Sequence, residues 1–304
     1  MTSAATSTIG QRLAGPACLS TAAAIWGGLY VVSTIVLGHI PPWVLLEFRI
    51  LLSLAVLGAV AQVRKSWRVQ SADLAALALV GLVGYTLSIG LQFLGTARSG
   101  AALGSLVTAA SPAFIALFAY QLLREPLRPD KVAAIAVAFA GVCLVVGLSG
   151  NMGGAGDART GNVLLFGAAV TWALYTVLSR RLTHHYSALT VTAWASLFGA
   201  IFTAPVAGWQ WASSGFVLPT TPLLWVGVAY LGVISTALAF YLWNKGFEYV
   251  EAATGSLYFF LQPLVGSALG AVLLGEPISW GFLAGAVLIA GSIYLSSRPA
   301  GMRP

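Results

Sequence analysis

The chain has 304 residues, of which 59% are hydrophobic and only 8% are charged, and its formal net charge is +7. A soluble domain carries about 25% charged residues, so this composition excludes a fold with an ordinary polar surface. The basic residues lie in short segments between apolar runs, which favours a membrane-topology signal and argues against nucleic-acid binding.

Ten apolar runs follow one another along the chain, each close to the ~17–25 residues that a membrane-spanning helix needs. Charged residues or prolines separate them, as at Pro41-Pro42 and at the basic residues 64–68. The first run exceeds the ~7–15 residues of a cleaved signal's apolar core, so we interpret it as a retained span. The predicted spans are residues 13–37, 43–63, 72–93, 101–123, 132–148, 162–178, 188–208, 222–243, 252–274 and 280–295.

Two of these runs, the fourth and the ninth, share one pattern of glycine, proline and a final Glu-Pro. Every shared feature recurs 151 positions later (255 minus 104, for example). The matched residues are Gly104-Ser105, Pro112 and Glu125-Pro126 in the first run, and Gly255-Ser256, Pro263 and Glu276-Pro277 in the second. A repeat at this distance indicates two related halves of one membrane protein.

Each half contains five predicted spans, and an odd number reverses the orientation of the second half. The sequence therefore predicts an all-α integral membrane protein with ten transmembrane helices, arranged as two inverted-topology five-helix repeats. The expected repeats are residues 13–148 and 162–297, joined by an extracytoplasmic linker loop, 149–161. With the N-terminus inside, 12 of the 15 Lys and Arg residues lie in inner segments, so we expect both termini to be cytoplasmic.

Pro112 and Pro263 lie within long apolar runs, and each frees the carbonyl four residues earlier, on Thr108 and Phe259. In a bilayer such a carbonyl needs a protein partner or a water-filled cavity. The two prolines are therefore expected to mark a cavity and, with Gly104 and Gly255, to act as hinges. Tolerated kinks packed on neighbouring helices are the alternative.

Polar and aromatic side chains at the same expected depth are candidates for the wall of this cavity. Trp26 and Tyr30 are four residues apart and share a helix face, and Trp172 and Tyr175 mirror them in the second half. Aromatic residues at this spacing are equally often packing residues, whereas a Gln amide in hydrocarbon must be hydrogen-bonded. The expected substrate-binding residues are Trp26, Tyr30, Tyr85, Gln92, Ser105, Thr108, Trp172, Tyr175, Tyr241, Asn244, Tyr258 and Gln262.

Apart from Asp73, which lies beside a loop at the start of the third run, only Glu47 and Arg49 bring charge into a predicted span. They are two residues apart, so they point to different helix faces. One interpretation is that Arg49 extends to the outer headgroups. The other, equally weighted, is a gate or a counter-charge for an anionic group of a solute. Glu47 is the single weak candidate for ion coupling.

Catalytic and metal-binding motifs such as H-E-x-x-H and G-x-S-x-G do not occur in the sequence, and Cys18 and Cys143 are isolated. We therefore expect no enzyme activity, no metal and no cofactor. A non-transporting scaffold subunit is the alternative from another class, and it would predict a long charged loop for partner binding.

The segments TGSLYFFLQPLVGSALGAVLLGEPISWGFLAGAVLIAGSIYL and LGSLVTAASPAFIALFAYQLLREPLRPDKVAAIAVAFAGVCLVVG resemble the two copies of the EamA-type domain, which defines the bacterial drug/metabolite transporter superfamily. The resemblance covers about residues 22–295, and Arg124-Glu125-Pro126 replaces the usual Leu-Gly-Glu-Pro type of ending in the first copy. It implies a multi-pass transporter of the bacterial cytoplasmic (inner) membrane, with a central cavity between helices one to four and six to nine.

The same resemblance implies a function in the lipid bilayer: alternating access that moves a small-molecule substrate. Export of amino acids or related metabolites is the expected activity, and a facilitator or importer of another metabolite is the alternative. A homodimer remains an open option for its assembly.

Overall fold

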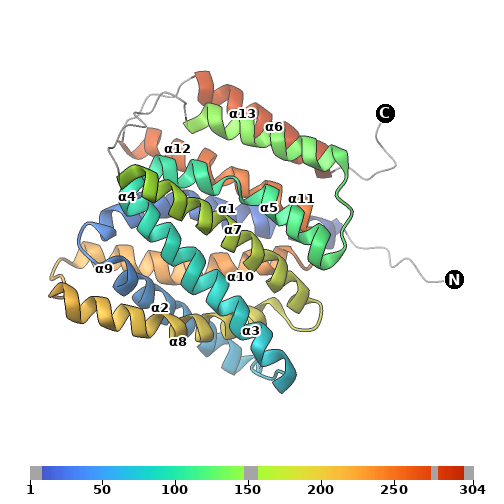
Figure 1. Ribbon diagram of the computed structural model, residues 1–304. Coiled ribbons are helices and arrows are strands. Elements are labelled where there is room, and N and C mark those ends of the chain that lie inside the picture. Colours follow the sequence, from blue (N-terminus) through green and yellow to red (C-terminus); the bar gives the residue numbers. More distant parts are fainter. Residues whose placement is uncertain (1–8, 147–156, 275–279, 298–304) are drawn as a thin grey trace.

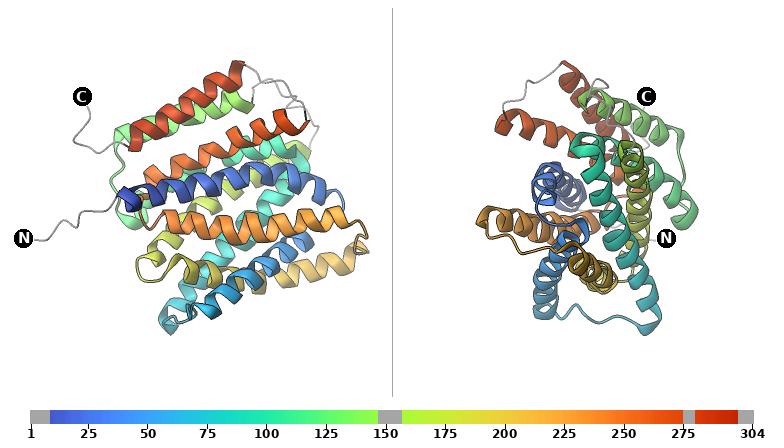
Figure 2. Two further views of the ribbon diagram at one scale, coloured as in Figure 1. Left: turned by 180° about the vertical axis from the view of Figure 1, so that it is seen from behind. Right: turned by 60° about the vertical axis from the view of Figure 1, so that its left-hand side comes forward.

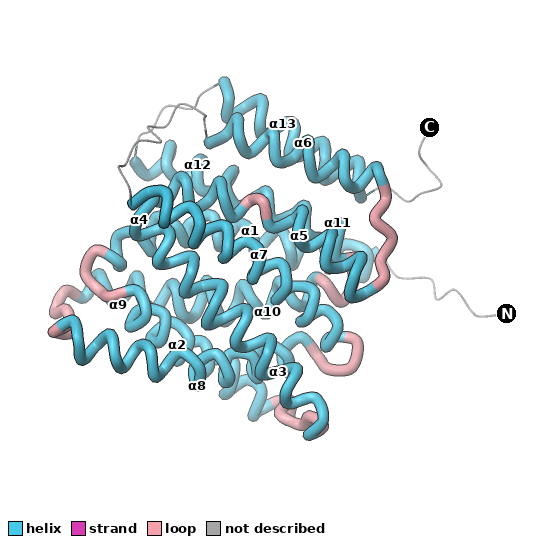
Figure 3. Tube along the Cα trace, viewed as in Figure 1, coloured by secondary structure: helices cyan, strands magenta, loops and turns pink. Residues whose placement is uncertain are grey.

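A computed structural model describes residues 9–146, 157–274 and 280–297. These residues form helices and short connections and contain no strand, as Figure 3 shows. Within the described residues, six helices are long and apolar enough to cross a membrane. They are Leu13–Leu37, Pro42–Val63, Ser71–Ser99, Arg159–Thr183, Ala188–Ser214 and Pro222–Gly246. Helices satisfy their backbone groups internally, so this composition is that of a multi-pass membrane protein.

The helices pack into one bundle (Figure 1), and several of the longer ones consist of consecutive elements that continue one another along the chain. Those before the linker are α1 (Ile9–Leu37), α2 (Pro42–Val63), η1 (Ser71–Asp73), α3 (Leu74–Val80), η2 (Gly81–Ser88), α4 (Ile89–Thr108), α5 (Ser111–Phe118), η3 (Ala119–Leu123) and α6 (Pro129–Val146). Those after it are α7 (Asp157–Thr183), α8 (Ala188–Ser214), α9 (Pro222–Ala229), η4 (Tyr230–Leu238), α10 (Ala239–Gly246), α11 (Ala252–Ser256), η5 (Leu257–Phe260), α12 (Leu261–Leu274) and α13 (Trp280–Ser297).

Two of the long helices contain a π-helical segment near the middle, η2 in the third span and η4 in the span that ends at Gly246. The two segments occupy corresponding positions in the sequence repeat. Adding the repeat's separation of 151 residues to the numbers of η2 gives positions 232–239, which overlap η4. The segments also have corresponding neighbours, because η2 packs on α7 and α8 while η4 packs on α1 and α2. π-Helical turns inside α-helices often occur at functional sites.

Both proline-containing runs depart from regular α-helix just before the proline, where the sequence predicted a hinge or a kink. In the first run α4 ends at Thr108 and α5 begins at Ser111, which places Pro112 in the first turn of a new helix, where its missing N–H is harmless. The freed Thr108 carbonyl accepts a hydrogen bond from Ser111 Oγ at 2.6 Å. In the second run the helix is continuous, but its 3₁₀ segment η5 lies between α11 and α12, so Pro263 follows a change of helical geometry and not a break.

The segment between the two halves differs from its predicted extent. α7 already begins at Asp157, so the last residues of the expected 149–161 linker are helical. Residues 147–156 lie outside the described residues. α6 and α13 pack side by side along one edge of the bundle (Figures 1 and 2).

Close backbone contact explains one glycine of this packing. A Cβ on Gly81, at the start of η2, would lie 2.7 Å from the Ala195 carbonyl oxygen and 2.7 Å from Phe198 Cβ, both on α8. Any side chain here would force the two helices apart. Small residues of this kind let membrane helices approach closely.

Candidate functional site

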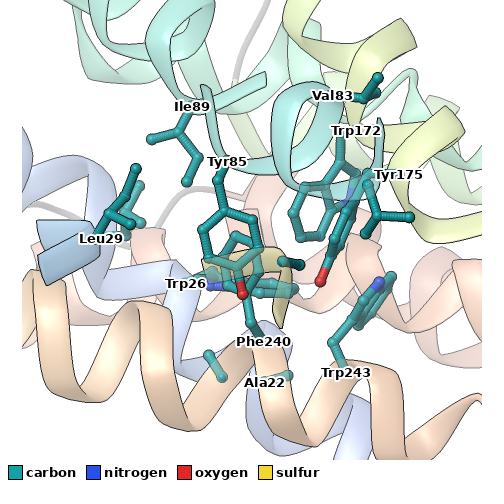
Figure 4. Close-up of a cluster of buried hydrophobic side chains, with 14 of the residues drawn as sticks. Ala22, Trp26, Leu29, Val83, Tyr85, Ile89, Trp172, Tyr175, Phe240 and Trp243 are labelled. Atoms are coloured by element: carbon teal, nitrogen blue, oxygen red, sulfur yellow. The ribbon is translucent and has the colours of Figure 1, made fainter. Parts of the chain in front are cut away.

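Aromatic rings from both halves of the chain meet at the centre of the bundle (Figure 4). The Trp26 ring of α1 lies 5.0 Å from the Trp172 ring of α7, at an interplanar angle of 89°. Phe240 of α10 lies 5.7 Å from Trp26 and 5.2 Å from Trp172, also edge-on. Edge-to-face rings at these distances attract each other beyond the effect of burial alone. We call Trp26, Trp172, Phe240, Trp243 and Phe259 the aromatic cluster.

A small cavity of about 30 Å³ adjoins this cluster. The residues around it come from α1, α2, η2, α4, α5, α7, α10, η5 and α12: Trp26, Leu29, Arg49, Ser88, Ile89, Gln92, Thr108, Ser111, Ala168, Trp172, Phe240, Phe259 and Gln262. The volume suffices for roughly two water molecules. Pockets for small organic ligands measure about 300–1,000 Å³, so the surrounding helices must separate before a solute fits.

Arg49 supplies the charge of this site. Its side chain is 1% exposed, its Nε donates to Thr236 Oγ1, and its Nη2 donates to Ser235 Oγ at 3.4 Å. The guanidinium carbon also lies 5.5 Å from the centre of the Phe93 ring, a cation–π contact. This burial excludes the interpretation in which Arg49 extends to the outer headgroups.

The Arg49 charge is not neutralised by an acidic side chain in the described part of the chain. Its Nη1 is buried without an acceptor, and no carboxylate lies within ion-pair distance. Glu47 does not pair with it, as their spacing predicted, and one oxygen of Glu47 is also buried without a partner. A buried cation without a counter-charge is costly, and such residues usually have a partner or a function.

The two central tryptophans differ in their hydrogen bonding. Trp26 Nε1 donates to the Ser235 carbonyl of η4 at 2.9 Å, whereas Trp172 Nε1 is buried without an acceptor. The cavity wall therefore contains two residues with an unused donor, Arg49 and Trp172, beside apolar faces of the aromatic cluster. This combination suits a solute with anionic oxygens at one end and an apolar body.

A chain of hydrogen bonds forms a second, neutral polar wall. Gln92 Nε2 donates to Tyr30 Oη at 2.7 Å, and Tyr30 Oη lies 2.6 Å from Thr108 Oγ1. Thr108 Oγ1 donates to the Gly104 carbonyl at 2.7 Å, so the proton between Tyr30 and Thr108 belongs to Tyr30. This chain ties α1 to α4 just before the break at Thr108.

The structure places the predicted substrate-binding residues in several environments. Five of them line the cavity: Trp26, Gln92, Thr108, Trp172 and Gln262. Tyr30 contacts two of these, as described above. Tyr85, Tyr175, Tyr258 and Asn244 are buried but are not part of the cavity wall, and Tyr85 packs 4.7 Å from Phe240. Tyr241 lines a separate groove. The Ser105 side chain lies outside the described residues.

Asn244 and Tyr175 form a polar contact behind the cluster. Asn244 Nδ2 donates to Tyr175 Oη at 3.0 Å and to Thr192 Oγ1 at 2.9 Å, which joins α10, α7 and α8. These side chains satisfy each other and hold the helices that carry Trp172 and Phe240. They support the cavity from outside it.

The sequence did not single out several residues of the cavity wall, chiefly Phe240, Leu29 and Ile89, and for Phe259 it predicted a role of the backbone carbonyl but not of the side chain. For Phe240 a signal existed, because it lies four residues before Asn244 on the same helix face. The aliphatic residues carried no such signal, since any apolar residue in a span can equally face lipid.

The predicted hinge residues lie where helices change geometry or touch. Pro112 follows a break and Pro263 follows a 3₁₀ segment. A Cβ on Gly104 would lie 3.0 Å from both Thr96 Oγ1 and Tyr30 Cε1. Gly255 likewise faces the ring of Phe247 without room for a side chain. Close packing therefore accounts for both glycines, and their hinge role stays a prediction.

Charged residues close the end of the bundle where α7 and α10 finish. Glu125 pairs with Arg180, and the other Glu125 oxygen accepts the Ala252 N–H at 3.0 Å. Lys131 pairs with Glu251. We call Glu125, Arg180, Lys131 and Glu251 the ionic latch, because they connect the segment after η3, the end of α7, the start of α6 and the start of α11.

The more buried pair of the latch is Arg180 with Glu125, whose side chains are 12% and 14% exposed. In the second pair Glu251 is more exposed. The hydrogen bond from Lys131 nevertheless lowers the pKa of the Glu251 carboxyl below its usual value. Among the described residues, no group of three His, Cys, Asp or Glu side chains could hold a metal ion.

The comparisons with known proteins agree with this arrangement. An uncharacterized transporter, YetK of Bacillus subtilis, is 31% identical over 71% of this chain, and the match spans 64% of YetK, just under two thirds of its length. An uncharacterized transporter of Archaeoglobus fulgidus is 28% identical over 90% of this chain and 93% of its own. A probable terminal-alkyne amino-acid exporter of Streptantibioticus cattleyicolor is 27% identical over 78% of this chain and 77% of its own.

A protein of known crystal structure, 26% identical in sequence, superposes with a TM-score of 0.77 and covers 95% of this chain and 96% of its own. The model of the EamA-like transporter family matches twice, at residues 13–147 and 159–298. Together the two matches span most of the chain, with a boundary where the linker lies. The chain therefore belongs to the EamA-like transporter family, within the drug/metabolite transporter superfamily.

Proposed function

We propose that this protein exports small carboxylate-bearing metabolites with an apolar body, of which amino acids with apolar side chains are the simplest. The observation that carries the proposal is the buried Arg49, whose Nη1 has no acceptor and which lines a cavity beside the aromatic cluster. The name of the Streptantibioticus relative, a probable terminal-alkyne amino-acid exporter, supports the same substrate class.

The cavity wall offers one chemical group for each part of such a solute. The guanidinium of Arg49 would bind the carboxylate, since charge-assisted bonds between Arg and carboxylate are strong and directional. Trp26, Trp172 and Phe240 would pack against the apolar side chain. Gln92 gives its amide nitrogen to Tyr30, which leaves its carbonyl oxygen to accept from an ammonium group.

The proposed architecture is that of ten transmembrane helices in two inverted repeats, residues 13–148 and 162–297, with both termini cytoplasmic. Support comes from the corresponding π-helical segments and their corresponding neighbours. The two matches of the family model, at 13–147 and 159–298, agree with the same division. The four predicted spans beyond the six long apolar helices are the shorter or interrupted segments around α5, α6, α12 and α13.

Transport would proceed by alternating access. The ionic latch closes the end of the bundle that we assign to the cytoplasm, and the cavity has room for little more than water. Opening the latch would let the helix ends at Arg180 and Glu125 separate and admit a solute to Arg49. The break before Pro112 and the 3₁₀ segment before Pro263 would then allow the helix halves to move against each other.

The test is efflux from proteoliposomes loaded with a mixture of amino acids and common metabolites, analysed by mass spectrometry. The wild type should selectively lose carboxylate-bearing solutes with apolar side chains. Arg49→Gln and Trp172→Ala should abolish or strongly reduce this loss, whereas Arg181→Gln, which changes an exposed arginine, should not. Efflux by Arg49→Gln at the wild-type rate, or selective loss of a class without carboxylates, would contradict the proposal.

A further inference from the structure

A groove of about 720 Å³ opens on the side of the bundle, separate from the cavity. Its walls are the end of α2, the start of α8 and the stretch from η4 to α10. Val56, Val60, Ile234 and Leu238 line it and are between 37% and 42% exposed. These residues belong to helices that are apolar enough to span a membrane, and their partial exposure leads us to place the groove against lipid.

One end of the groove is charged. Arg64 directly follows the last residue of α2, and Lys245 lies in the last turn of α10. Glu248 accepts the Ala188 N–H at 2.9 Å with one oxygen and pairs with Lys245 through the other. Both oxygens of Glu248 are therefore engaged within the protein. Arg64 is exposed and makes no ion pair in the part of the chain that the structure describes, which leaves net positive charge here.

We propose that this groove binds one phospholipid with an anionic headgroup. The headgroup lies against Arg64, at the level where α2 and α10 end and the bilayer meets water. One acyl chain runs along Val60, Val56, Ile234 and Leu238 toward the membrane centre. Basic residues at helix ends attract anionic lipids, and here a defined apolar channel continues directly from the basic residue.

The charged end and the apolar walls of the groove together favour this occupant. A small soluble anion would satisfy Arg64 but would leave the apolar walls without contacts. A zwitterionic lipid would fill the walls but would match the excess positive charge less well. An anionic phospholipid does both, and its size suits a groove within the range of ligand pockets.

The groove also has a structural link to the cavity. η4 supplies Ile234 and Ala237 to the groove, and its Ser235 and Thr236 side chains bind Arg49. The same short π-helical segment therefore has the lipid on one face and the buried arginine on another. The lipid site does not depend on the identity of the transported solute.

Native mass spectrometry of the full-length protein in detergent, with added phosphatidylglycerol or phosphatidylcholine, tests the proposal. The wild type should retain one phosphatidylglycerol at concentrations where phosphatidylcholine does not bind. Arg64→Gln should weaken phosphatidylglycerol binding roughly tenfold, the typical loss of one charge-assisted contact. Arg68→Gln is the matched control, since Arg68 is an exposed arginine of the same loop that does not line the groove.

A second variant tests the apolar part of the site. Val60→Trp places a large side chain in the groove without altering its charge, and it should prevent retention of the lipid. Circular dichroism checks that each variant is folded. Equal losses for Arg64→Gln and Arg68→Gln, equal retention of both lipids by the wild type, or full retention by Val60→Trp would each overturn the proposal.

Discussion

The pair of Arg180 and Glu125 in the ionic latch is the clearest target for perturbation. Removing one partner of a fully buried pair costs about 3–5 kcal/mol, and an exposed pair contributes about 0–1 kcal/mol. With side chains 12% and 14% exposed, this pair lies between these limits, at about 2 kcal/mol. Arg180→Gln should therefore raise the ratio of open to closed molecules about 30-fold.

The assay follows a buried cysteine placed next to Arg180 of the latch. Ser179 is fully buried next to Arg180, so Ser179→Cys, in a chain whose Cys18 and Cys143 are changed to Ser, should react with a water-soluble thiol reagent only when the latch opens. Adding Arg180→Gln should accelerate labelling by about the same factor of 30. Arg181→Gln removes an equal charge from the exposed face of the same helix and should leave the rate unchanged.

Two results would refute this reasoning. Equal labelling rates for Arg180→Gln and Arg181→Gln would show that the pair does not hold the end closed. Acceleration accompanied by loss of helical signal in circular dichroism would show unfolding and not opening. Glu125→Gln is the reciprocal variant and should accelerate labelling as Arg180→Gln does.

Three stability measurements in detergent test other features of the fold. Gly81→Ala should lower the melting temperature because a Cβ there meets the α8 backbone. Gly208→Ala has open space around it and should be neutral or stabilising, so the two variants should differ in free energy of unfolding by about 2 kcal/mol. Arg124 has a φ of 56°, in the left-handed region, so Arg124→Gly should stabilise by up to about 1 kcal/mol. Lys131 lowers the pKa of Glu251 below 4.5, so the ionised carboxylate stabilises the folded state. The melting temperature of the wild type should therefore exceed that of Glu251→Gln above pH 4.5, and the two melting temperatures should converge as the pH falls and Glu251 is protonated.

The apolar runs predicted an all-helical membrane protein, and six of the ten runs coincide with helices long and apolar enough to cross a membrane. Not every boundary was predictable, because α4 continues from Ile89 to Thr108 through the loop expected between the third and fourth runs. The places where both runs with a proline depart from regular α-helix were also predictable, since Pro112 and Pro263 recur at one place in both halves. The form of each departure was not predicted, because the choice between a kink and a full break depends on local partners. For Thr108 that partner is the Ser111 hydroxyl.

The cavity wall was only partly predictable. Phe240 and Tyr241 are adjacent aromatic residues of one helix, yet Phe240 lines the cavity and Tyr241 lines the groove. Which of them points inward depends on the rotation of α10, and this rotation follows from packing across η4. The π-helical segments carry no motif, since they shift the hydrogen-bond register of an ordinary apolar stretch. Arg49 was recognised as unusual, but only tertiary structure separates a buried charge from one that reaches the headgroups.

The central claim is that Arg49 binds the carboxylate of the transported solute. The most direct measurement compares proteoliposome uptake of phenylalanine and of phenylalaninamide, which lacks the carboxylate, for wild type and Arg49→Gln. Hydrogen bonds to charged groups contribute about 1.5–3 kcal/mol, so the wild type should prefer the amino acid at least about tenfold, and the variant should lose this preference. If Arg49→Gln still transports and keeps the wild-type preference, Arg49 does not bind the carboxylate and the account is wrong.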